Sequence, residues 1–208
     1  MSLVMRTTLA IGACVVVTVT AGCGGASSTA SSDPASASPT PSASGTATAC
    51  ANPQLSAASS PVTQLALTVS DLPPGGPSLE QISDGEMNNT ANSDQRGFAN
   101  ISNTYRIEDD VVLDPSALAA TADYPQLRDA TKTQFATVTS ATSPAALGCV
   151  ADEFIGKNRT SYSQVGIAFQ EGDVIAVVLV VNSAAPVDPA FAEAVAQAQG
   201  QKIASATT

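Results

Sequence analysis

The side chains that most often carry catalysis and metal binding are unevenly represented in this chain. It has four cysteines, 18 acidic residues and no histidine. The absence of histidine excludes Ser-His-Asp and Cys-His nucleophile pairs and histidine-ligated metals. No CxxC pair, no G-x-S-x-G motif and no Walker or dinucleotide glycine pattern occurs either. We therefore expect no metal site, no cofactor and no catalytic residues.

Carboxylates are the remaining candidates for chemistry. Asp84, Glu86, Asn88 and Asn89 surround Gly85 and offer the oxygen ligands that Ca²⁺ prefers. Their spacing is not that of an EF-hand, and these residue types are common in loops. We therefore predict a long polar loop over residues 84–96.

A second group of acids, Glu108, Asp109, Asp110 and Asp114, precedes a predicted helix. Acidic side chains complement the positive end of a helix dipole, which explains this group without catalysis. A glycosidase would need two facing acids and aromatic platforms for sugar, but the chain has no Trp and three Tyr. A histidine-free hydrolase is therefore the least favoured function.

The first 22 residues have the features of an export signal. Arg6 is their only charge, Leu9 to Val19 is an apolar run, and the small residues Ala21 and Gly22 precede Cys23. About eleven apolar residues are too few to span a bilayer, which needs roughly 20. Residues 1–23 resemble the lipobox signal of bacterial lipoproteins. This resemblance implies cleavage before Cys23, a diacylglyceryl group on its sulfur, and an extracytoplasmic domain anchored to the cell membrane.

Several alternatives to this signal remain open. Thr20 stands where the lipoprotein family usually has Leu, and Cys14 also follows small residues. Cleavage at Cys14 would leave only about seven residues for the apolar core, which favours Cys23. An uncleaved anchor and an ordinary signal peptide are further alternatives, and Met5 is an alternative start to Met1.

Residues 23–49 are predicted to be a disordered linker that begins at the lipidated Cys23. After this cysteine, the segment consists of Gly, Ala, Ser, Thr and Pro with one charge, Asp33. Such a segment has too little apolar surface to offset its ordering entropy. Its 26 residues give a mean reach of roughly 25–30 Å. The composition resembles that of actinobacterial envelope lipoproteins.

Two cysteines, Cys50 and Cys149, remain in the domain after lipidation and signal removal. An even pair in an oxidising compartment predicts a Cys50–Cys149 disulfide. This crosslink would close a loop of about 100 residues, which stabilises a domain by up to about 4.7 kcal/mol in the chain-entropy model. Two free thiols, or a redox or metal role, are the alternatives.

The net charge of the predicted exported chain argues against polyanionic partners. Without residues 1–22, seven basic residues remain against 18 acidic ones, a net charge of −11. Nucleic acids and anionic lipid headgroups are bound by clustered Lys and Arg, so neither is an expected partner.

Residues 50–208 have the length of one domain. Residues 161–169 and 173–181 are β-rich runs around Gly172 and predict a hairpin, with the second strand covered on both faces. Residues 62–69 suit a strand or short amphipathic segment, and Gly97 to Ile107 alternates like a half-buried strand.

Helices are predicted after Asp114-Pro115 and Asp188-Pro189, where a carboxylate caps and proline begins the helix. Two more are predicted over residues 125–138 and 144–154, the latter carrying Cys149. Together these elements predict an α+β fold, an antiparallel sheet with helices packed on one face.

Three functions fit this description. The first is a non-enzymatic binding or protein-interaction module in the envelope. The second is a carrier of a lipid or other apolar ligand, which requires an apolar cavity of at least roughly 300 Å³. The third is the histidine-free hydrolase.

Overall fold

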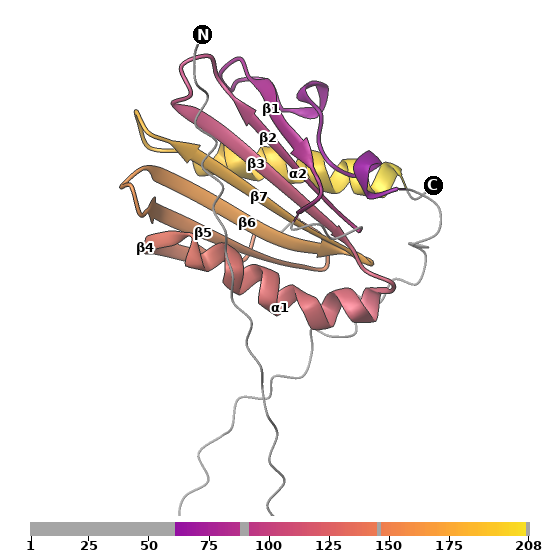
Figure 1. The fold of residues 1–208 in the computed structure, drawn as a ribbon. Coiled ribbons are helices and arrows are strands. Elements are labelled where there is room, and N and C mark those ends of the chain that lie inside the picture. Colours follow the sequence, from indigo (N-terminus) through magenta and orange to yellow (C-terminus); the bar gives the residue numbers. More distant parts are fainter. Residues whose placement is uncertain (1–60, 88–91, 145–146, 207–208) are drawn as a thin grey trace, which may run out of the picture. The chain divides into compact units, whose positions relative to one another are not determined.

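Seven strands form one antiparallel sheet in the part of the chain that the structure describes, in the order β1-β2-β3-β7-β6-β5-β4 (Figure 1). This computed structural model describes residues 61–87, 92–144 and 147–206. The signal peptide, Cys23, the 23–49 linker and Cys50 lie outside these residues. The strands are β1 (Glu80–Gly85), β2 (Ser93–Ala99), β3 (Tyr105–Leu113), β4 (Phe135–Thr142), β5 (Val150–Asn158), β6 (Ser163–Glu171) and β7 (Val174–Asn182).

The predicted hairpin of residues 161–181 is confirmed as β6 and β7. Its turn includes Gly172 at a φ of 60°, a conformation that glycine adopts without strain. β7 is buried along most of its length and lies between β3 and β6. The prediction that this apolar strand is covered on both faces is therefore confirmed.

The two helices lie on opposite faces of the sheet (Figure 1). Tyr124 of α1 (Ala117–Thr133) packs with Ile175 and Val177, whereas Val195 of α2 (Pro189–Ser205) belongs to the core that contains Val178. Successive side chains of a strand point to opposite faces, so odd and even residues of β7 meet different helices. The α+β class is confirmed, but the prediction of helices on one face is wrong because β7 is apolar on both faces.

The helix boundaries depend on local caps. Asp188 caps α2 and Pro189 is its first residue, as predicted. The other predicted start is displaced by two residues, because Ser116 accepts a hydrogen bond from the Ala119 amide and α1 begins at Ala117. The predicted 125–138 helix ends early because residues 135–142 pair as β4, and the predicted 144–154 helix is wrong because residues 150–158 pair between β4 and β6 as β5.

Residues 97–107 form the end of β2, a turn and the start of β3, and not one strand. The Asn100 side chain accepts hydrogen bonds from the amides of Thr104 and Tyr105, which closes the turn. Ile101, an apolar residue of the alternation that predicted a half-buried strand, lies in this turn and is 99% exposed. The predicted 84–96 loop is correspondingly shorter, because residues up to 85 belong to β1 and residues from 93 belong to β2.

Residues 61–72, here called the strap, lie on the same face of the sheet as α2. The strap contains two 3-10 helices, Val62–Gln64 and Val69–Asp71. Its buried side chains, Val62, Leu65, Ala66 and Leu67, join the core formed by α2 and the sheet. The segment is therefore amphipathic but not a strand, and a turn with Pro73 and Pro74 follows it.

The two edge strands are irregular. β1 has a bulge between Gln81 and Ser83, and β4 has register shifts after Phe135 and after Val138. β4 contains no charged residue, and most of its residues are exposed.

Candidate functional site

Three consecutive acids of β3 lie in two different environments. Glu108, Asp109 and Asp110 precede α1 in the chain as predicted, but all three lie inside β3, so their explanation by the helix dipole is wrong. Ile107 and Val111 belong to the core beneath α2, so Asp109 between them points to the α2 face. Glu108 and Asp110 point to the α1 face.

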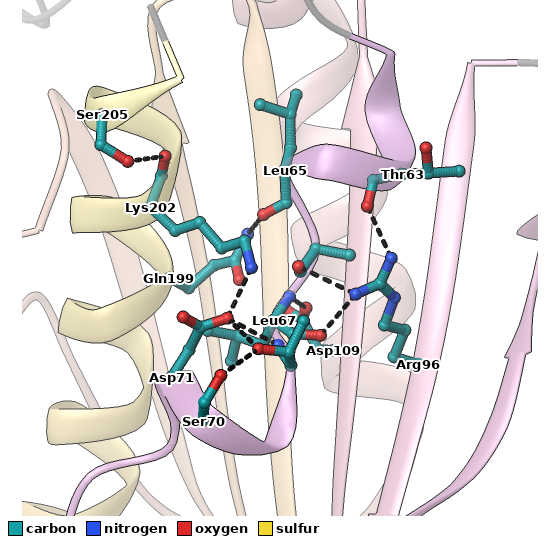
Figure 2. A network of polar contacts seen from close by, with 12 residues as sticks. Thr63, Leu65, Leu67, Ser70, Asp71, Arg96, Asp109, Gln199, Lys202 and Ser205 are labelled. Carbon is teal, nitrogen blue, oxygen red and sulfur yellow. Dashed lines mark hydrogen bonds and ion pairs between the residues drawn. The ribbon is translucent and has the colours of Figure 1, made fainter.

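Asp109 is completely buried beneath the strap (Figure 2). Its Oδ2 accepts a hydrogen bond from the Leu67 amide at 2.7 Å, while its Oδ1 has no hydrogen-bond partner among the described residues. Arg96 of β2 lies directly opposite Asp109 in the strand register. Asp94, also buried, has an oxygen 3.2 Å from the Arg96 guanidinium.

Arg96 binds the backbone of the strap. Its guanidinium donates hydrogen bonds to the carbonyl oxygens of Ala66 (3.2 Å), Leu67 (2.8 Å) and Thr63. Figure 2 shows this side chain reaching from β2 toward the strap. The strap is thus held through its main chain by side chains of the sheet.

Helix α2 holds the strap from the other side (Figure 2). The Gln199 amide donates to the Leu65 carbonyl at 2.8 Å, and the Lys202 ammonium forms an ion pair with Asp71. Asp71 also accepts from the amide and hydroxyl of Thr68. These polar contacts make the strap an integral layer of the domain.

The buried cluster of Asp94, Arg96 and Asp109 contains two acids and one permanent cation. Burial raises the pKa of Asp109 to about 7, although the Leu67 hydrogen bond and the Arg96 charge act against this rise. Burial also raises the pKa of Asp94, again opposed by Arg96. The charged side chains of this cluster thus bind the main chain of the strap, and Arg96 is the member that also borders the hollow described next.

A second polar group lies on the α1 face of β1, β2 and β3. Helix α1 contacts β4, β6 and β7, and Figure 1 shows that no described helix lies over β1 and β2 on this face. A hollow of about 110 Å³ opens here. It is lined by Ile82, Ser83, Gln95, Arg96, Gly97, Phe98, Arg106, Ile107 and Glu108.

The shape of this hollow follows from a glycine and a bulge. A Cβ atom at Gly97 would lie 2.3 Å from the Ser83 hydroxyl and 3.5 Å from Ile82, so these two side chains close over the glycine. The bulge in β1 allows the successive residues Ile82 and Ser83 to border the same hollow. Ile82 remains 57% exposed, an apolar rim beside a polar floor.

Glu108 is the carboxylate that lines the hollow. Burial raises its pKa, with opposition from the nearby Arg106, yet no hydrogen bond or ion pair to its side chain occurs within the described ranges. The neighbouring acid Asp110 accepts a hydrogen bond from Gln95 at 2.7 Å, and burial raises its pKa to about 6. Arg106 donates to Asn103 at 2.7 Å. Glu108 is therefore available to a cationic or hydrogen-bond-donating group.

The other residues singled out in the sequence do not form a site. Asp84 lies on the opposite face from the hollow, 3.9 Å from Arg96, and Glu86 follows the end of β1, while Asn88 and Asn89 lie outside the described residues. No group of three acidic or sulfur side chains suited to a metal is found in the described part of the chain.

Cys149, predicted to be in a disulfide, immediately precedes β5. Its amide donates to the Gln170 carbonyl at 2.9 Å. The predicted partner, Cys50, lies outside the described residues, so the Cys50–Cys149 disulfide stays a prediction.

Neither helix in the described ranges has the length and apolar character of a membrane span.

Tyr124 and Asp152 form the pairing of a hydroxyl with a carboxylate that most resembles an activated nucleophile. The Tyr124 hydroxyl donates to Asp152 at 2.8 Å and to the Ala168 carbonyl at 3.0 Å. Burial raises the pKa of Tyr124, and the neighbouring carboxylate adds to the rise. A raised pKa opposes formation of the reactive phenolate, so this buried pair supports helix packing.

The hollow and the strap contacts were not predicted from the sequence. Arg96 and Asp109 become neighbours through the pairing of β2 and β3, and both bind residues about 30 to 40 positions earlier in the chain. Arg96 is the one basic residue of the predicted 84–96 loop, but nothing in the sequence marks it as buried.

No protein-family model matches the chain, and no curated protein shows detectable sequence similarity to it.

Proposed function

We propose that this chain is a membrane-anchored envelope lipoprotein whose domain is a non-enzymatic module that binds another envelope protein. The observation that carries the proposal is the part of the α1 face that no described helix covers, with the hollow over Gly97 and with Glu108, whose side chain has no hydrogen-bond partner among the described residues. An apolar rim at Ile82 next to a desolvated carboxylate suits a protein surface that presents a lysine or arginine side chain.

The volume of the hollow favours a protein partner over a carried ligand. About 110 Å³ is enough for part of a side chain, whereas ligand pockets occupy roughly 300–1,000 Å³. Between α2 and the sheet, where a carrier would hold its ligand, Val195 and Ile203 pack with Ile167 and Phe169. The carrier alternative therefore has no supporting observation.

Site-specific photocrosslinking in an actinobacterial envelope tests the binding face. A crosslinking residue in place of Ile82 should give one reproducible protein adduct, and the same residue in place of the exposed Gln197 on α2 should not. Adding Glu108→Lys should reduce the Ile82 adduct at least about tenfold through charge repulsion. The matched control, Glu193→Lys on α2, should leave the adduct unchanged. Equal effects of the two variants would reject the face.

The lipid anchor requires its own test. Cys23→Ser should release the protein from membranes and abolish its labelling by a fatty acid, because the sulfur is the proposed acceptor. Cys14→Ser is the matched control and should remain anchored. If Cys14→Ser alone loses the label, then the lipid is attached at the earlier cysteine.

A further inference from the structure

The strap has an unusual mode of attachment, because charged groups hold it and those charges do not balance. Its backbone is bound by Arg96 and Asp109, and a second acid, Asp94, lies within the same buried cluster. With both acids ionised the cluster has a net charge of −1. With one acid protonated it is neutral.

Because the cluster is buried, its excess negative charge should destabilise the attachment of the strap. Asp94, Arg96 and Asp109 are 1%, 9% and 0% exposed, so water does little to stabilise an excess charge among them. Asp109 Oδ1 and Arg96 Nε are also buried without a hydrogen-bond partner among the described residues. Freeing the strap would uncover these groups to water.

The other charges around Asp109 are few. Asp110 follows it in β3 but points to the opposite face, and Asp84 of β1 lies 3.9 Å from Arg96. Asp71 of the strap is neutralised by Lys202 of α2. Val178 of β7 pairs with Asp109 and Gln199 of α2 binds the strap, and neither residue carries a charge.

We propose that the strap is a pH-sensitive latch, held most tightly in acid, where the Asp94–Arg96–Asp109 cluster is neutral, and loosened as both carboxylates become charged. The raised pKa of Asp109, about 7, sets the range. Because an exposed aspartate titrates near 3.9, docking should weaken from about pH 4 to pH 7 and change little above that. A released strap of about twelve residues extends by up to about 40 Å and would lengthen the proposed tether accordingly. The inference does not depend on what the open face binds.

Hydrogen–deuterium exchange of the full mature chain tests the latch. Strap amides, such as that of Leu67, are compared with β7 amides at pH 5 and pH 7.5, after correction for intrinsic exchange rates. We expect protection of the strap, relative to β7, to be at least about tenfold lower at pH 7.5, since linkage permits tenfold per pH unit. Equal changes in strap and β7 would overturn the proposal.

Three variants separate the latch from a general effect of pH. Asp109→Asn keeps an acceptor for the Leu67 amide and should abolish the pH dependence. Asp94→Asn makes ionised Asp109 balance Arg96, so the dependence should move to lower pH. Asp110→Asn, on the opposite face, should retain it. A pH dependence that survives in Asp109→Asn would also overturn the proposal, and the Asp94→Asn result provides the test if Asp109→Asn does not fold.

Discussion

Glu108 and Asp109 are neighbours in β3, yet they differ in almost every property that matters for function. Asp109 points beneath the strap, where it is fully buried and binds the Leu67 amide. Glu108 points to the open α1 face, lines a small hollow and has no hydrogen-bond partner within the described residues. The strand supplies both carboxylates, and the layer that covers each face determines whether the acid holds the fold or remains available for binding.

The largest expected difference between the two faces concerns their arginines. Arg96→Met removes the cation from a cluster with two buried acids and the donor to three strap carbonyls. We expect a loss of about 3–5 kcal/mol in unfolding free energy, the usual effect of breaking a buried ion pair. The exposed Arg106 should tolerate the same change with a loss below about 0.5 kcal/mol. Urea unfolding measures both, and similar losses would contradict the comparison.

Buried Asp109 should also make the stability of the domain depend on pH. Asp109 has its pKa raised to about 7 in the folded state, so the folded state binds more protons than the unfolded state between about pH 4 and pH 7. The contribution of Asp109 to stability is therefore greatest below this window and is lost as pH rises through it.

Asp109→Asn should remove this contribution. As pH rises from 4.5 to 7.5, the unfolding free energy of the variant minus that of the native chain should increase by on the order of 2–4 kcal/mol. Chemical unfolding at both pH values measures the gain, and an unchanged difference between native chain and variant would show that Asp109 does not titrate in this range.

A larger side chain at Gly97, in the hollow, should lower both the stability of the domain and binding at the open face. Gly97→Val inserts atoms where Ser83 and Ile82 already approach, which should cost about 1–3 kcal/mol and reduce binding at the open face. Gly85→Ala is the control, because a Cβ there meets nothing within 4 Å and should change stability by less than about 0.5 kcal/mol. Thermal unfolding and the Ile82 crosslinking yield together check this prediction.

The smallest effect is expected at the β2–β3 turn. Ile101 is almost fully exposed, so Ile101→Ser should alter unfolding free energy by less than about 0.5 kcal/mol. Ile107, a few residues later, is fully buried on the α2 face, and even Ile107→Val should cost about 0.5–1.5 kcal/mol. An appreciable loss in Ile101→Ser would mean that another part of the chain packs on the turn.

Local signals predicted the parts of the fold whose contacts are close in sequence. The β6–β7 hairpin and the Asp188 cap of α2 each depend on a few adjacent residues, and both were predicted. The β2–β3 turn was missed because Ile101 continues the apolar alternation through it. β5 was mistaken for a helix because its strand character comes from pairing with β4 and β6.

The candidate sites were harder to predict, because both depend on strand register. The hollow requires the β1 bulge to place Ile82 and Ser83 over Gly97, and no sequence pattern marks a bulge reliably. The latch requires Arg96 to face Asp109 across two strands and the strap to cover both. The acidic residues of β3 could be identified in the sequence. The sheet face to which each one points could be assigned only from the layers that cover the sheet.

The irregular edge strands should affect whether copies of the domain associate through their sheet edges. Under the proposed lipid anchoring, copies on one membrane would meet at high local concentration, where an open strand edge can recruit the edge of a neighbour and begin aggregation. β4 has no charge to discourage this, but its two register shifts interrupt the even row of amides and carbonyls that a neighbouring strand would need. The register shifts in β4 would therefore keep crowded copies from joining their sheets.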